Sequence, residues 1–237
     1  MKYLFIVLNL FFASMLRAED NVVPFVFDQP NTNQEYREES SLFNQTNYMV
    51  ALGFGTACLF NRSDHNCDEI ASTLEESPIE FSFDMGNWYG QGDTMGLMVL
   101  GFYGLGWARD DDRMIDTSQD MTQSLLATWA VTWALKVSIN AERPNGHCYS
   151  FPSGHTSTAF AVAPVICRHY GIWAGISAYT LASITALARV EDSMHHPRDV
   201  LAGAAIGIIA GRTVSKLVPL TVVPTKRGLV PGLIYQF

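Results

Sequence analysis

A chain of 237 residues with 48% hydrophobic side chains has enough apolar surface for one large domain or two small ones, which excludes a wholly disordered protein. Its 15 basic and 23 acidic side chains give a net charge of −8, so we expect no nucleic-acid partner. A mean hydropathy of +0.10 is low for a protein made mostly of membrane spans.

The charge is unevenly distributed along the chain. Residues 18–120 contain four basic and 19 acidic side chains, whereas residues 121–237 contain nine basic and four acidic ones. We therefore expect any site for an anion to lie in the second half of the chain.

Residues 1–18 are typical of a signal peptide. Lys2 supplies the positive charge, Tyr3–Phe12 the apolar stretch, and Ala18 the small residue near a cleavage site. The apolar stretch is too short for a comfortable membrane span, although an uncleaved anchor is an alternative. Either interpretation predicts an exported protein, periplasmic or membrane-associated.

Export would permit disulfide bonds between the four cysteines. Cys58 and Cys67 flank a polar loop and could close a short covalent hairpin. Cys148 and Cys167 are poor partners, because Cys167 would lie ~20 Å along a helix and bonded Cα atoms must be within ~7 Å. We expect Cys167 to be a thiol in the core.

The remaining chain predicts an all-α fold, a bundle of about five core helices. Residues 19–92 are polar or without a clear period, and we interpret them as an arm and loops before a helical domain at 93–217. No mature segment contains 20 strongly apolar residues, so buried helices are favoured over membrane spans. The tail, 218–237, could form a β-hairpin around its Pro and Gly residues. The helices are expected at about 95–107, 117–141, 153–169, 171–188 and 197–216.

The first segment with chemical potential contains Lys136 and Arg143. Seven residues are two helical turns, so the two cations are predicted to share one helix face, ~10 Å apart. Burying them is costly unless they meet an anion. A lysine that extends its charge to solvent is the simpler alternative.

The second segment is Ser150–Ser157, immediately before an apolar helical stretch. Ser153 can cap that helix, and the unpaired backbone N–H groups of the first turn would then point toward an anion. Gly154 would let the ligand approach the backbone, and His155 would stand beside it as a proton donor. An ordinary helix cap with a first-turn histidine is the alternative.

The third segment contains Arg189, His195 and Asp199. The carboxylate of Asp199 can hold one imidazole nitrogen of His195 as N–H, which leaves the other nitrogen available for attack. Arg189 could bind two phosphate oxygens. The alternatives are an ion pair of Arg189 with a nearby acidic side chain, Glu191 or Asp192, and a metal site at His195, His196 and Asp199.

Together, Lys-x6-Arg-Pro from Lys136, Pro-Ser-Gly-His ending at His155, and Arg-x5-His-x3-Asp from Arg189 resemble the type-2 phosphatidic acid phosphatase superfamily. That superfamily includes bacterial class A acid phosphatases and vanadium haloperoxidases. The resemblance covers about residues 93–215. One departure is Ala188, where the family usually has a serine and one possible hydrogen bond is lost.

The resemblance implies a phosphatase that needs no metal and no cofactor. His195 would be the nucleophile that forms a phospho-histidine, Asp199 would orient it, and His155 would protonate the leaving alcohol. The phosphate oxygens would be bound by Lys136, Arg143, Ser153, Gly154 and Arg189.

The expected substrate is a phosphomonoester, soluble or lipid-borne. Peripheral contact with a bilayer is expected from the tryptophans at positions 107, 129, 133 and 173, if they are exposed. The alternatives are a vanadate-dependent haloperoxidase and a non-catalytic anion-binding helical protein. Every enzymatic interpretation requires His155 and His195 to face the same site.

Overall fold

The computed structural model of the protein describes residues 45–60, 67–75, 81–217, 220–225 and 228–233. The predicted signal peptide, 1–18, and the first part of the predicted arm, 19–44, lie outside the described residues. The side chains of Cys58 and Cys67 are also outside the described part of the structure, so the disulfide between them stays a prediction.

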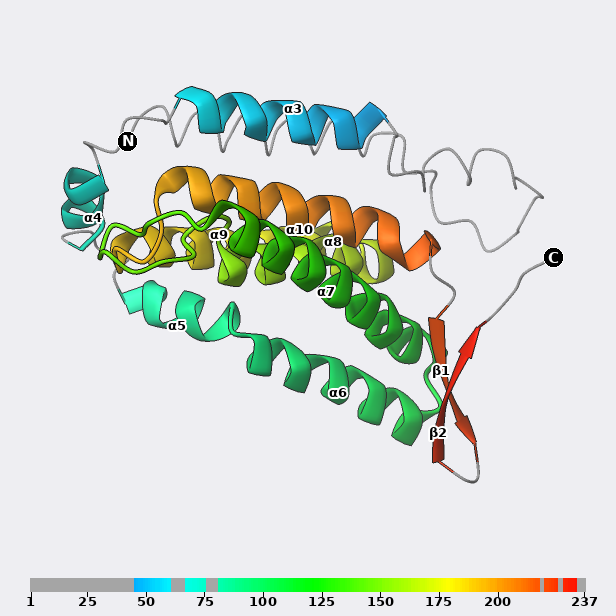
Figure 1. The fold of residues 1–237 in the computed structure, drawn as a ribbon. Helices are drawn as coiled ribbons and strands as arrows, with labels where there is room; N and C mark the ends of the chain where they lie inside the picture. Colours follow the sequence, from blue (N-terminus) through cyan, green and yellow to red (C-terminus); the bar gives the residue numbers. More distant parts are fainter. Residues whose placement is uncertain (1–44, 61–66, 76–80, 218–219, 226–227, 234–237) are drawn as a thin grey trace.

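The described residues form eight helices and one two-stranded hairpin, which confirms the predicted all-α class with a C-terminal hairpin (Figure 1). The elements are α3 (Gln45–Phe60), α4 (Cys67–Glu75), α5 (Phe81–Tyr89), α6 (Gly92–Arg109), α7 (Asp112–Ile139), α8 (Gly154–Tyr170), α9 (Ile172–Glu191), α10 (Pro197–Leu217), β1 (Leu220–Thr225) and β2 (Gly228–Leu233).

Helix α8 is the centre of the bundle and packs against α7, α9 and α10. Helix α3 covers α10, α5 packs on α9, and α6 runs along α7. The loops after α7 and α9 lie at one end of the bundle, near α4, and the hairpin lies at the other end (Figure 1). This arrangement brings the loops that carry the three sequence segments together.

Small residues allow α8 and α10 to approach closely. Gly203, Gly207 and Gly211 recur every fourth residue on α10, so they share the face that meets α8. A Cβ atom at Gly211 would lie 2.9 Å from Cγ of Pro164, which leaves no room for a side chain. Several α8 side chains have no exposed area, namely those of Ala159, Ala161, Val162, Ala163 and Val165.

Three helices occupy a region in which the sequence predicted loops. Helices α3, α4 and α5 lie between residues 45 and 89. On α3, Val50 is buried and Nδ2 of Asn47 donates to Oγ1 of Thr213 on α10 at 3.0 Å. Tertiary contacts of this kind stabilise helices whose own sequence lacks a clear amphipathic period.

Helix α7 begins and ends earlier than predicted. The carboxylate of Asp111 accepts from the backbone N–H of Met114, which caps the start of the helix. At the other end Asn140 has a φ of 45° and its N–H donates to the carbonyl of Lys136, which closes the last turn. Arg143 therefore lies in the following loop, and the prediction that it shares a helix face with Lys136 is wrong.

The predicted exposed tryptophans are exposed. Trp107, Trp129, Trp133 and Trp173 expose 68%, 60%, 44% and 79% of their surface. Among the described helices, none has both the length and the apolar composition needed to cross a bilayer.

Candidate active site

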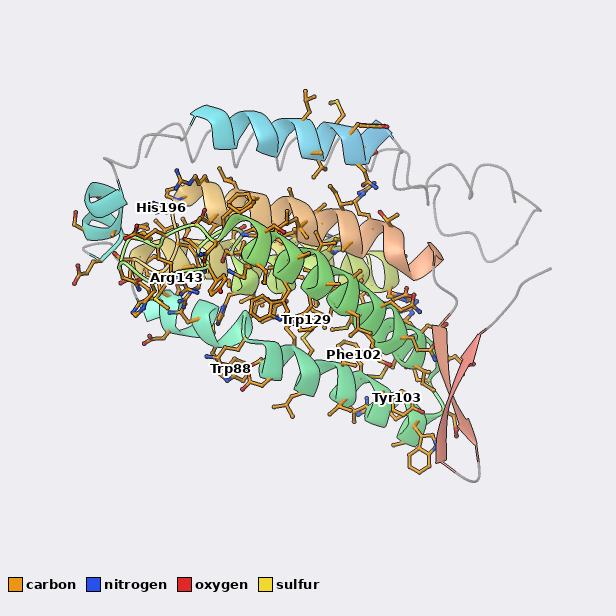
Figure 2. All side chains as sticks on the ribbon, viewed as in Figure 1. Trp88, Phe102, Tyr103, Trp129, Arg143 and His196 are labelled. Atoms are coloured by element: carbon orange, nitrogen blue, oxygen red, sulfur yellow. The ribbon has the colours of Figure 1, made fainter. Side chains whose placement is uncertain are left out.

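The three segments meet at one end of the bundle, at the starts of α8 and α10. The N–H of Ser153, just before α8, donates to the carbonyl of Asp199 on α10 at 2.9 Å. A Cβ atom on Gly154 would be in van der Waals contact with Cε of Lys136, at 3.8 Å. Figure 2 shows the labelled side chains of Arg143 and His196 at this same end.

The imidazole of His195 and the carboxylate of Asp199 are both buried, with 3% and 0% of their surfaces exposed. Nδ1 of His195 lies 3.8 Å from Oδ2 of Asp199, a distance for electrostatic attraction rather than a hydrogen bond. The same oxygen accepts from Oγ of Ser150 at 2.5 Å and from the N–H of His196 at 2.9 Å. His195 and Asp199 are therefore neighbours, as predicted, but they interact through charge and not through a hydrogen bond.

The pKa values of both groups are lowered, for different reasons. Burial lowers the pKa of His195, because the charged imidazolium is costly away from water. Burial alone would raise the pKa of Asp199, but the neighbouring His195, the hydroxyl of Ser150 and the N–H of His196 outweigh it and hold that pKa below its usual value. A neutral imidazole beside an ionised carboxylate is the protonation state that a nucleophilic histidine needs.

His155 stands in the first turn of α8, against the end of α5. A Cβ atom at Gly90 would lie 3.0 Å from Cβ of His155, so the helix approaches this glycine closely. Burial lowers the pKa of His155 to about 4, and so do the charges of Arg189, His195, Arg143 and Lys136, in that order. The charges of the three predicted cations and of His195 thus all disfavour protonation of this imidazole.

Ser153 occupies the N-cap position of α8, as predicted, but its side chain does not cap the helix. Its hydroxyl oxygen accepts from Oγ1 of Thr156 at 3.0 Å instead, so the predicted side-chain cap is wrong. The first-turn N–H groups still carry the positive end of the helix dipole, which suits an anion.

Lys136 extends from the last turn of α7 toward α8. Its Nζ donates to the carbonyl of Tyr149 at 2.6 Å. Burial and the charge of Arg143 lower the pKa of Lys136 to about 8. The bond holds the backbone of Tyr149, whose φ of 63° lies in the left-handed region that bulky residues rarely adopt.

Arg143 reaches the site from the loop between α7 and α8. Its backbone N–H donates to the carbonyl of His147 at 2.7 Å, which fixes the turn. Its Nη1 lies 4.0 Å from Sδ of Met194, the residue before His195. Its Nε is buried and has no hydrogen-bond partner among the described residues, so a donor is available there.

Arg189 has two partners at one nitrogen of its guanidinium. Nη1 donates to Oδ1 of Asn87 at 2.7 Å and to Oδ2 of Asp192 at 2.9 Å. The ion pair with Asp192 is one of the alternatives that the sequence left open, and it is present. Only 7% of Arg189 is exposed, and its Nε has no partner within the described part of the chain. The ion pair therefore leaves part of the guanidinium available for an anion.

The described side chains contain no group of three or more His, Cys, Asp or Glu residues placed to hold a metal ion. The sequence left open a metal site at His195, His196 and Asp199. In the structure the backbone N–H of His196 donates to the carboxylate of Asp199. What the site offers is positive charge and hydrogen-bond donors, which suit the oxygens of an anion.

Sequence reasoning missed two polar residues at the site. Ser150 lies in the same short loop as Ser153, so its proximity to the α8 start was available as a signal. Asn87 gave no signal, because it is 102 positions before Arg189 and in a region predicted to be loops.

Part of the chain that carries the candidate site is similar to known proteins. Residues 107–221 match the family model described as the PAP2 superfamily, and that segment contains all eight predicted site residues. Over 80 residues the chain is 44% identical to a protein named lipid A 1-phosphatase from Porphyromonas gingivalis, covering 32% of this chain and 18% of that relative. The chain thus spans less than a fifth of this relative's length.

Two solved structures share the fold. LpxE of Aquifex aeolicus superposes with a TM-score of 0.52 at 20% identity, covering 64% of this chain and 94% of that one. A transmembrane PAP2-type phosphatidylglycerolphosphate phosphatase of Bacillus subtilis gives a TM-score of 0.57 at 18% identity, covering 70% and 92%. At these identities the likeness concerns the fold alone.

Proposed function

We propose that this chain, whose residues 107–221 belong to the PAP2 superfamily, is a phosphatase that hydrolyses phosphomonoesters through a phospho-histidine intermediate on His195. One observation carries the proposal. The start of α8 meets both the start of α10 and the last turn of α7: the N–H of Ser153 donates to the carbonyl of Asp199 at 2.9 Å, and a Cβ atom on Gly154 would lie 3.8 Å from Cε of Lys136. A nucleophile, a proton donor and a positive anion site are therefore close enough to act on one phosphoryl group.

In the first step, Nε2 of His195 attacks the phosphorus, and the bond between phosphorus and the leaving oxygen breaks. His155 gives its proton to that oxygen, which leaves as an alcohol. The imidazole of His195 becomes positively charged as the P–N bond forms. Asp199, whose Oδ2 is 3.8 Å from Nδ1, stabilises that charge.

In the second step, water attacks the phosphorus of the phospho-histidine. His155, now neutral, accepts a proton from this water, and the P–N bond breaks. Inorganic phosphate is released, and both histidines return to their starting protonation states.

The phosphoryl oxygens are stabilised by fixed positive groups. Lys136, Arg143 and Arg189 supply three cationic side chains, and Ser153 and Gly154 place the start of α8 beside them. In the transition state negative charge spreads over the three equatorial oxygens, and such groups lower the energy of that state. The proposed mechanism therefore requires no metal ion and no cofactor.

The low pKa of His155 has a place in this cycle. The cations that lower it to about 4 are the groups that bind the phosphate. A bound phosphate neutralises part of their charge, so it raises the pKa of His155 and favours the protonated acid when substrate is present. The general acid is thus formed in the enzyme–substrate complex.

We further propose a lipid-borne phosphate as substrate and an exported, membrane-associated protein. The relative from Porphyromonas gingivalis is named a lipid A 1-phosphatase, and the Bacillus subtilis neighbour is a transmembrane phosphatase. In this chain, large apolar side chains such as those of Leu100, Trp107 and Trp129 are exposed on α6 and α7. Exposed apolar surface of this kind fits contact with a bilayer.

The test is phosphate release from p-nitrophenyl phosphate. His195→Ala is expected to abolish turnover, and orthovanadate is expected to inhibit the wild type as a mimic of five-coordinate phosphorus. His147→Ala is the matched control, because that histidine is exposed in the neighbouring loop, and it should keep wild-type turnover. Near-normal turnover by His195→Ala would overturn the covalent mechanism.

Trapping the intermediate gives a second readout. In His155→Ala the good leaving group p-nitrophenolate needs no proton, so phosphorylated protein should form and accumulate because water then lacks its base. Acid-labile, base-stable phosphate on the protein is the expected result. Halide oxidation by peroxide with added vanadate, at rates above phosphate release, would instead identify a haloperoxidase.

A further inference from the structure

We propose that Asn87 on α5 is a positioning residue that, with Asp192, turns the guanidinium of Arg189 so that its Nε–Nη2 edge faces the phosphate. This inference rests on the proposed function, since it concerns the orientation of a phosphate-binding cation. Asn87 would then help to orient a phosphate-binding side chain from α5, a helix that lies outside the segment 107–221.

Three hydrogen bonds close a ring among these side chains. Nη1 of Arg189 donates to Oδ1 of Asn87 at 2.7 Å and to Oδ2 of Asp192 at 2.9 Å. Nδ2 of Asn87 donates to the same Oδ2 at 2.9 Å. Because each side chain contacts both others, the guanidinium is held in one orientation.

The orientation matters because a guanidinium has two edges that can each bind two oxygens. One edge pairs Nη1 with Nη2, and the other pairs Nε with Nη2. Asn87 and Asp192 both accept from Nη1, which occupies the first edge. Nε is buried and has no partner among the described residues, so the second edge is the one left for a phosphate.

Asn87 is itself held firmly against α9, the helix that carries Arg189. Oγ1 of Thr185, one turn before Arg189, donates to the carbonyl of Gly86 at 2.8 Å. A Cβ atom at Gly86 would lie 2.9 Å from the carbonyl carbon of Ile184, so the two backbones are in direct contact. A rigid support of this kind is what a positioning residue needs.

The ring also limits how strongly Asp192 competes with a phosphate. A carboxylate that pairs with Arg189 would compete with substrate for the cation, and the side chain of Asp192 is 34% exposed. Nδ2 of Asn87 donates to the same oxygen of Asp192 that accepts from Arg189, so part of the negative charge of that oxygen is stabilised by Asn87. Asn87 thus keeps Asp192 at the Nη1 corner and away from the other edge.

The experiment is a double-mutant cycle between Asn87→Ala and Arg189→Lys, read by orthovanadate binding and by kcat and KM. In the wild-type background, Asn87→Ala is expected to weaken orthovanadate binding by roughly ten- to a hundredfold and to raise KM less. Lysine has no edge to orient, so in the Arg189→Lys background the same change should cost about twofold or less. Asp84→Asn, an exposed change on α5, is the control and should leave all constants at their wild-type values.

The cycle separates the possible outcomes. An equal cost of Asn87→Ala in both backgrounds would identify a purely structural role and overturn the proposal, as would unchanged orthovanadate binding with a normal melting temperature. If the wild type bound orthovanadate but released no phosphate from any ester, the proposed function would fail, while the binding cycle would still decide the role of Asn87. Failure of the wild type to bind orthovanadate would overturn both.

Discussion

Nδ1 of His195 and Oδ2 of Asp199 lie 3.8 Å apart, and that oxygen already accepts hydrogen bonds from Ser150 and from the N–H of His196. The other oxygen of Asp199 accepts no hydrogen bond among the described residues and lies 3.7 Å from Nε of Arg198. Asp199 is therefore fixed by groups other than the histidine it serves, and it acts on His195 mainly through its negative charge. The pair differs in this way from one whose carboxylate is oriented by the imidazole itself.

This relationship predicts that the charge of Asp199 matters more than the bond that fixes it. Asp199→Asn keeps the shape but removes the charge that stabilises the developing imidazolium, so kcat should fall by about a hundredfold or more. Ser150→Ala removes one of two hydrogen bonds to the carboxylate and should lower kcat by roughly tenfold. Steady-state kinetics on p-nitrophenyl phosphate measures both, and a larger loss in Ser150→Ala would contradict this assignment.

The pKa shifts of the two histidines predict the pH dependence. His195 must be neutral to attack, and its lowered pKa places the acid limb below pH 6.5. His155 must be protonated to act as the acid, and its pKa of about 4 in the free protein makes kcat/KM fall as the pH rises above the acid range. Bound phosphate raises this pKa, so the basic limb of kcat should lie at higher pH than that of kcat/KM.

Two pH profiles measured on the wild type test this, with a sulfonated buffer series at constant ionic strength. The matched variant is Arg143→Gln, which removes one of the charges that lower the pKa of His155. Its basic limb in kcat/KM should move to higher pH even though its rates are lower. Identical basic limbs for kcat and kcat/KM in the wild type would mean that substrate does not raise the pKa of His155.

Lys136 predicts a second effect of pH, on phosphate binding. With its pKa lowered to about 8, the side chain is charged below that pH and loses its charge above it. Inhibition by inorganic phosphate should therefore weaken as the pH rises from 8 to 9.5, where phosphate itself stays a dianion. Lys136→Arg keeps its charge over this range, so its inhibition constant should be constant, and a decline equal to that of the wild type would contradict the role.

The helices that could be predicted from the sequence are those with strong local signals. Pro197 begins α10 as a first-turn proline does, and the apolar stretch after Ser153 gave α8 to within one residue at each end. The end of α7 was predicted two residues late, because Asn140 was not recognised as the residue that ends the helix in the left-handed conformation. Arg143 was expected on the helix face of Lys136 because of the seven-residue spacing, although it lies beyond both the predicted and the observed end of the helix.

The site was predictable where spacing along the chain carried the information. His155, His195 and Asp199 were proposed as site residues because their motifs are local. The contact of Arg189 with Asn87 spans 102 positions and depends on how α5 packs on α9, so no local pattern contains it. The hydroxyl of Ser153 was assigned as a cap, but Thr156, one turn later, donates to it in the folded helix.

The close approach of α10 and α8 makes a stability prediction. A Cβ atom at Gly207 would lie 2.8 Å from the nitrogen of Ala161 and 2.9 Å from the carbonyl carbon of Phe160, both backbone atoms that cannot move aside cheaply. Gly207→Ala should therefore lower the free energy of unfolding by about 1–3 kcal/mol. Gly101→Ala, where nothing lies within 4 Å, is the control and should be neutral or stabilising by about 0.5–1 kcal/mol. Urea unfolding measures both, and equal midpoints for the two variants would show that α8 and α10 can separate at little cost.

The exposed tryptophans make the last prediction, which concerns the substrate. Trp107 and Trp129 lie on α6 and α7, two helices that pack side by side, and expose 68% and 60% of their surface. If the surface that carries these two side chains contacts a bilayer, replacing both by serine removes aromatic surface from the membrane interface without changing the cations that bind phosphate. Turnover of a lipid phosphate in vesicles should then fall by roughly tenfold or more, together with vesicle cosedimentation, while turnover of p-nitrophenyl phosphate stays at the wild-type rate. Equal losses on the two substrates would mean that the double variant damages the site, and unchanged lipid turnover would mean that this face does not bring the protein to its substrate.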